Sequence, residues 1–205
     1  MDALSAGARL VGLDVDPITR QKASMLKNRV AFIEEVYGGE GLAQVIAAMP
    51  EAYRDILDQP LLPSNWITMD ASGAFLDATA SVLGGDQVIY DMGVYGAQKS
   101  LSGIYKIFVM IGSPGFIVRR GAVTFKQLFE GGHSEARAEE KEGQMHAIWR
   151  SYGFAPHHRL IEVVMHGWMA EALRLSGADL EQSRVVVSLT EGHGYFEVEG
   201  SWAKK

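Results

Sequence analysis

Apolar residues recur at helical spacing through most of the chain before residue 130. In the first such segment they follow steps of four, three and four, which places them on one face of a helix: Leu26, Val30, Ile33 and Tyr37. Gly38-Gly39 then end this helix. The same spacing predicts four later helices, over 42–49, 51–57, 68–83 and 99–111.

A further helix start stands at Ser113-Pro114. Serine is a common N-cap and proline suits the first helical position, so the sequence predicts a helix from there to about Phe129. Residues 1–21 show no sustained period and contain Pro17. We therefore expect an N-terminal arm over 1–21, followed by a helical half over roughly 22–130.

The period changes to two after Gly131-Gly132. Charged side chains then alternate with smaller ones, which predicts a strand with one wet face: Glu135, Arg137, Glu139 and Lys141. Gly143 permits a turn into a second strand, in which Met145, Ala147 and Trp149 share a face. Pro156 opens a helix to about Ser176, and two more strands follow, over 184–189 and 195–202.

This order of elements predicts an α+β fold. The helical half packs on a four-stranded antiparallel sheet whose chain order is strand-strand-helix-strand-strand. We expect the helical half (22–130) and a mixed half (131–205) to share one core and to form a single domain.

Charge and composition narrow the function classes. The chain has 205 residues and a formal net charge of -6, so its surface repels a phosphate backbone and we expect no nucleic-acid partner. It contains no cysteine, which excludes thiolate zinc sites, Fe–S clusters and a cysteine nucleophile. We therefore expect no cysteine-based metal site or cofactor.

The chain offers no membrane or export segment. Its start lacks the charged and apolar regions of a signal peptide. The most apolar stretch, Ile104 to Val118, is interrupted by Lys106 and Pro114 and is shorter than the roughly 20 residues of a membrane helix. These features predict a cytoplasmic protein without a membrane span.

The histidines form no recognised metal motif. His157 and His158 are adjacent at a helix start, so we expect one to be solvated and the other packed. His158 and His166 lie two helical turns apart, about 12 Å along the axis, too far to share one ion. Ser113 is explained as an N-cap, and no other nucleophile stands beside a base, so we expect no enzyme.

Aromatic side chains gather in the mixed half. Three of them are candidates for the wall of a ligand pocket between sheet and helices: Trp149, Trp168 and Tyr195. His158 or His166 would be its polar contact. The alternative is that these aromatic residues are simply core.

Several segments resemble known families. In the second half they are the C-terminal hairpin Gly192-His193-Gly194-Tyr195-Phe196-Glu197-Val198-Glu199-Gly200-Ser201-Trp202 and the preceding helix, with Pro156, His158, Arg159, Gly167 and Trp168. In the first half they are the stretches 29–38, 60–66 and 112–114, the last together with Arg119-Arg120. The C-terminal hairpin and its helix resemble the 4-vinyl reductase domain. The first half is similar to an uncharacterised bacterial family, found in myxobacteria, that is distantly related to that domain and to the haem nitric-oxide-binding domain. The resemblance spans about 26 to 202.

Departures from these families bear on cofactors. Ser188 and Phe196 stand where the 4-vinyl reductase domain has cysteines, so the resemblance implies no zinc site here. Haem in the nitric-oxide-binding domain uses an axial histidine on the helix after the glycine-containing break and a Tyr-x-Ser-x-Arg motif. Residues 118–129 contain no histidine and the motif is absent, so we expect no haem.

The resemblance implies a non-enzymatic sensor or regulatory module that binds a small apolar or aromatic ligand. It would signal to a separate output protein and form a homodimer through its helical half, where the segment from Ile104 to Val118 offers apolar surface. The alternative is a dimeric scaffold without a ligand, because the related fold also serves as a scaffold in vesicle-tethering subunits.

Overall fold

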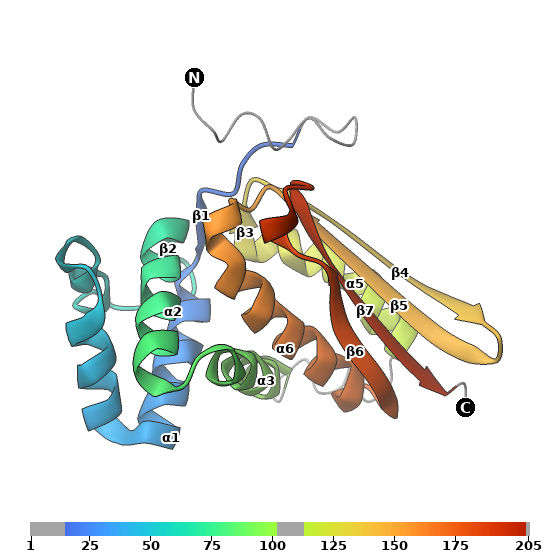
Figure 1. Cartoon of the computed structure of the whole chain (residues 1–205), viewed down its shortest axis with the longest axis horizontal. Helices are drawn as coiled ribbons and strands as arrows, with labels where there is room; N and C mark the ends of the chain where they lie inside the picture. The colour runs from blue at the N-terminus through green and yellow to red at the C-terminus, as the bar shows by residue number, and fades with distance from the viewer. Residues whose placement is uncertain (1–14, 102–112, 204–205) are drawn as a thin grey trace.

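The computed structural model describes residues 15–101 and 113–203. Its helical half contains α1 (Ala23–Ala48), the 3₁₀ helix η3 (Glu51–Leu57), α2 (Met69–Leu83) and α3 (Asp86–Leu101) (Figure 1). Gly38 interrupts α1 with a φ of 71°, so the helix bends at the glycine where the sequence predicts an end. Most of the helix predicted over 99–111 lies outside the described residues.

A small three-stranded sheet joins the two halves. Its strands are β1 (Arg20–Lys22), β2 (Trp66–Thr68) and β3 (Phe129–Glu130), in the order β2-β1-β3. The end of the predicted arm is therefore the central strand of a sheet, and its Gln21 side chain is fully buried. A strand of three residues is too short to show a period, which is why the sequence pattern missed it.

The main sheet contains β4 (His133–Lys141), β5 (Gln144–Tyr152), β6 (Leu180–Val187) and β7 (Tyr195–Ala203). The strands are antiparallel in the order β4-β5-β7-β6. Between β5 and β6 the chain forms the short η4 (Pro156–His158) and α6 (Arg159–Leu175), and η5 (Leu189–Glu191) precedes β7. The predicted α+β fold and its strand-strand-helix-strand-strand order are confirmed.

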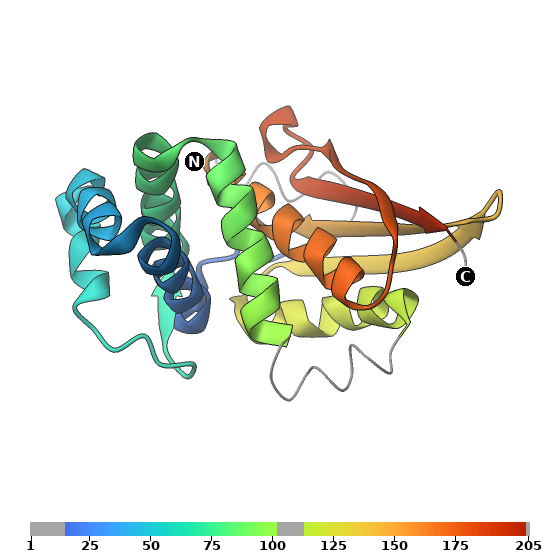
Figure 2. The ribbon, with the colours of Figure 1, turned by 90° about the horizontal axis from the view of Figure 1, so that it is seen from below.

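Two helices cover one face of this sheet. α5 (Pro114–Leu128) begins at Ser113, whose hydroxyl accepts a hydrogen bond from the Phe116 amide, as the sequence predicts. α5 and α6 lie side by side on the inner face of the sheet, and α3 runs along the other side of α6 (Figures 1 and 2). The outer face carries charged side chains, among them the ion pairs Arg150–Glu197 and Arg184–Glu199.

The α3–α6 contact is close enough to involve backbone atoms. A Cβ on Gly93 of α3 would lie 2.1 Å from the Val164 carbonyl oxygen, and one on Gly167 of α6 would lie 2.1 Å from that of Tyr90. Only glycine fits at these two positions. The main hydrophobic cluster extends through this contact, from Phe75 in α2 to Phe196 in β7.

None of the helices within 15–101 and 113–203 is both long and apolar enough to cross a membrane.

Candidate functional site

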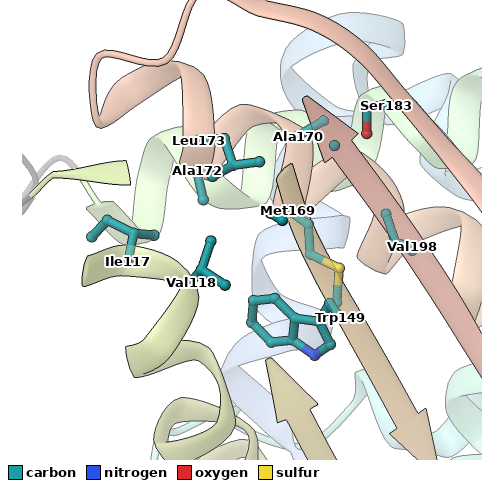
Figure 3. A pocket seen from close by; sticks show the side chains of 11 residues that line it. Ile117, Val118, Trp149, Met169, Ala170, Ala172, Leu173, Ser183 and Val198 are labelled. Carbon is teal, nitrogen blue, oxygen red and sulfur yellow. The ribbon is translucent and has the colours of Figure 1, made fainter. Parts of the chain in front are cut away.

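A cavity lies between α5, α6 and the inner face of the main sheet (Figure 3). Its walls are almost entirely apolar and come from all three elements: Ile117 and Val118 of α5, Met169 and Leu173 of α6, and Trp149 and Val198 of the sheet. Ser183 of β6 is its polar wall residue. The cavity volume is about 20 Å³, which is room for a single water molecule.

Trp149 closes the cavity on the side of α5. Its indole ring lies directly on Gly121, where a Cβ would be 1.9 Å from the Trp149 Cη2 atom. The indole is 9% exposed, and its Nε1 has no hydrogen-bond partner among the described residues. A glycine in the middle of α5 is thus what allows the large ring to fill the space between helix and sheet.

His166 reaches the same region from α6. Its Nε2 lies 2.8 Å from the hydroxyl oxygen of Ser183, and its ring stacks edge-on against Tyr90. Burial lowers the pKa of His166 below its ordinary value, which favours the neutral imidazole. His166 therefore contacts the cavity through Ser183 and is not itself a wall residue.

Trp168 and Tyr195 do not lie at this cavity. Trp168 is on the α3 side of α6, where its Cδ1 atom would be 3.6 Å from a Cβ on Gly96. Tyr195 pairs with Tyr152, whereas Trp149 pairs with Val198. Side chains alternate between faces along a strand, so Tyr195 is on the outer face, with its ring 5.7 Å from the Arg150 guanidinium carbon.

His158 is also remote from the cavity walls. It is 5% exposed, whereas the neighbouring His157 side chain is 64% exposed, so the predicted division into one packed and one solvated histidine is confirmed. Its Nε2 lies 3.4 Å from a carboxylate oxygen of Asp70 at the start of α2. Burial lowers the pKa of His158, and the carboxylate of Asp70 opposes that shift.

The sequence thus locates one cavity residue, Trp149, and a neighbour, His166. It missed Gly121 and the apolar side chains of α5 and α6 because these look like ordinary parts of amphipathic helices. A glycine in mid-helix, opposite a predicted strand with a large aromatic residue, was the available signal.

Comparisons with known proteins give a fold but no family. No family model and no curated protein matches the chain. Among solved structures, the chain is similar to an unliganded Fe(II) H-NOX protein from K. algicida, with a TM-score of 0.65 at 8% identity over 90% of this chain and 97% of that one. It is also similar to an H-NOX protein from S. oneidensis in the Fe(II)NO ligation state, with a TM-score of 0.63 at 10% identity over 89% and 99%. The chain therefore has the fold of H-NOX domains, which agrees with its resemblance to the haem nitric-oxide-binding domain.

Proposed function

We propose that this protein is a haem-independent sensor domain with the H-NOX fold, which binds a small apolar or aromatic molecule between α5, α6 and the main sheet. The observation that carries the proposal is the apolar lining of the cavity on all three elements, closed by Trp149. Ligand sites are mostly apolar with a few polar groups, and here the Ser183–His166 pair supplies them. The H-NOX neighbours support a sensing role, since one of them was captured with NO on its iron.

Haem itself does not fit the residues present. An axial ligand from the helix after the glycine-containing break would come from α5, whose residues 114–128 include no histidine. The Trp149 ring occupies the space beside Gly121 on that helix. The remaining volume of about 20 Å³ is far smaller than a haem.

A ligand larger than water must displace Trp149. The indole N–H is buried without a partner in the described part of the chain, and such an unpaired donor costs about 1–3 kcal/mol. Moving the indole into a position where this group is hydrated or bonded recovers part of that cost. The closed cavity is then the resting state, and the ligand stabilises an open one.

Ligand binding can be transmitted through α6. This helix forms one wall of the cavity and is locked to α3 through Gly93 and Gly167 on its other side. A displacement of α6 would therefore carry α3 and the helical half with it. We propose a non-enzymatic role in which a separate output protein, or a second copy of the chain, reads that displacement.

The alternative is a dimeric scaffold without a ligand. The small cavity volume favours it, because a scaffold fills its interior with side chains. The two proposals differ in whether any small molecule binds and stabilises the folded chain against unfolding.

The test measures melting temperature and tryptophan fluorescence with a panel of phenols and fatty acids. We expect at least one class to raise the melting temperature of the wild type. Trp149→Phe should keep this response but lose the accompanying fluorescence change, whereas Trp66→Phe, which alters an indole of β2 packed under Lys22, should keep both.

A variant with a filled cavity locates the site. Ala147→Leu extends a wall residue into the cavity and should abolish the response, with circular dichroism checking that the variant folds. If no ligand stabilises the wild type and light scattering gives a dimer, the scaffold proposal replaces the sensor. An unchanged response in Ala147→Leu would place the ligand elsewhere.

A further inference from the structure

A second cluster of polar side chains lies where α2 begins and where η4 leads into α6. Asp70, His157 and His158 each offer one ligand atom, and these atoms all lie within 4.8 Å of one another. The Nε2 atoms of His158 and His157 are 3.4 and 3.6 Å from the same oxygen, Oδ1 of Asp70. None of the three residues lines the cavity described above.

Neighbouring contacts fix this arrangement. The Thr68 hydroxyl caps α2 by accepting a hydrogen bond from the Ala71 amide, which sets the first turn that carries Asp70. Directly after His158, Arg159 donates two hydrogen bonds to the carboxylate of Asp86 at the start of α3. The buried imidazole of His158 lies against Gly73, one turn beyond Asp70. Contacts at the starts of α2, α3 and α6 therefore hold Asp70 of α2 close to the two histidines of η4.

The separations are long for hydrogen bonds and are close to those between two ligands of one metal ion. A nitrogen donor and an oxygen acceptor in a good hydrogen bond are about 2.7–3.2 Å apart, shorter than both distances here. Ligands bound to zinc at about 2.0–2.1 Å in a tetrahedral site are separated by roughly 3.4 Å. The two imidazole rings approach each other edge to face, with centroids 4.1 Å apart, and one nitrogen of each lies within 4.8 Å of the other.

We propose that Asp70, His157 and His158 bind one divalent transition-metal ion of the zinc type. Two imidazoles and one carboxylate form a donor set that suits zinc, cobalt or nickel. Asp70 and His157 are exposed, so an ion can enter from solvent and keep water at its fourth position. The bound ion would tie α2, in the helical half, to the start of α6, in the mixed half.

The proposal does not depend on the sensor function and replaces the sequence expectation of no metal. That expectation rested on the absence of thiolates and of recognised histidine spacings. The two adjacent histidines have a third donor only because the fold brings Asp70 beside them from a distant part of the chain.

The experiment uses the full chain, stripped with EDTA and titrated with Zn²⁺ by calorimetry and with Co²⁺ by visible absorption. We expect one ion per chain and a Co²⁺ spectrum of low coordination number. Asp70→Asn and His157→Gln change exposed side chains and should retain the fold, as circular dichroism will check. Each should weaken Zn²⁺ binding about tenfold or more, because loss of a ligand exceeds the 10–100-fold cost of losing its supporting contacts.

His193→Gln is the matched control. His193 is exposed and lies 3.6 Å from a carboxylate oxygen of Glu191, but it belongs to no three-residue cluster in the described part of the chain. Its variant should bind Zn²⁺ as the wild type does. Wild-type affinity in the double variant of Asp70 and His157, or an equal loss in His193→Gln, would overturn the proposal.

Thermal unfolding gives an independent measure. A ligand at hundredfold excess over its dissociation constant should raise the melting temperature of a chain this size by roughly 5–10 °C. We expect this rise for the wild type and for His193→Gln with Zn²⁺, and its loss in Asp70→Asn. Equal rises in all three proteins would also contradict the site.

Discussion

The two sides of α6 are packed by different means. Toward α3 the contact is backbone against backbone, since Gly93 and Gly167 bring each helix onto the other's carbonyl oxygens. Toward α5 and the sheet the space is filled by one large side chain, Trp149, which lies on Gly121 and leaves a small cavity beside it.

This difference separates a fixed contact from an adjustable one. A backbone carbonyl cannot move without shifting its helix, whereas an indole ring can rotate about its side-chain bonds. In the proposed function, the α5–sheet side would admit the ligand and the α3–α6 side would transmit the resulting motion. Glycine allows the two helix backbones to touch on the α3 side, whereas it makes room for the Trp149 ring on the α5 side.

The largest expected effect comes from adding a single methyl group at the close α3–α6 contact. Gly167→Ala places a Cβ 2.1 Å from the Tyr90 carbonyl oxygen, so α3 and α6 must separate. We expect a loss of about 3 kcal/mol in the free energy of unfolding, or a melting temperature lower by roughly 6–12 °C. Thermal denaturation followed by circular dichroism measures it.

Gly96→Ala is the control for that variant. The added Cβ would lie 3.6 Å from the Cδ1 atom of Trp168, an ordinary contact, and alanine favours a helix over glycine by about 1 kcal/mol. We expect unchanged or slightly increased stability. If both alanine variants lose the same stability, backbone proximity does not distinguish the two glycines.

At the Gly121–Trp149 contact, a larger residue in place of Gly121 should be tolerated when Trp149 is replaced by a smaller one. Gly121→Ala clashes with three ring atoms of Trp149, and we expect it to cost about 1–2 kcal/mol. Trp149→Phe replaces the indole with a shorter phenyl ring, which removes the outer ring atoms that touch Gly121. The double variant of Gly121→Ala and Trp149→Phe should therefore recover about 1 kcal/mol in a double-mutant cycle. No such rescue by a side-chain change is expected for Gly167→Ala. A cycle with no coupling would contradict the direct contact.

The sequence predicted the fold because its periods are clear. The alternation in 134–149 predicted the β4–β5 hairpin, and Ser113-Pro114 predicted the start of α5. The three-residue strand β1 could not be predicted, because its burial depends on β2 and β3 from distant parts of the chain.

The site was predicted less completely for two physical reasons. The face on which Tyr195 lies depends on its register with β5, which a sequence period does not give. The closeness of α3 and α6 and the convergence of Asp70 with His157 and His158 are tertiary contacts between separate helices. Glycine in a helix looks the same whether it is exposed or pressed against a carbonyl group.

The adjustable side should also respond to pH. Burial lowers the pKa of His166 in the folded chain below its ordinary value of 6.5, and Arg174 adds to that shift. Protonation then favours the unfolded chain, so the stabilising contribution is present above pH 6.5 and decreases as the pH falls below it. His166→Gln, which can still bond Ser183, should reduce this decline in stability. The pKa of His158 is lowered in the same way, so His158 accounts for part of the decline that remains in the variant. Urea denaturation at pH 7.5 and 5.5 measures the change, and identical pH dependence in both proteins would exclude His166 as its source.

The smallest effect is expected on the outer face of the sheet, and it tests where the ligand site ends. Tyr195 packs against Tyr152 and lies near Arg150, with the sheet between it and the cavity. Tyr195→Phe removes one hydroxyl group from this half-exposed position, so the free energy of unfolding should change by no more than about 0.5 kcal/mol. The ligand-induced rise in melting temperature should equal that of the wild type, because no wall residue has changed. A smaller ligand-induced rise in this variant, with Trp66→Phe unaffected, would place the binding site on the outer face and contradict the proposed role of Trp149 in closing the cavity.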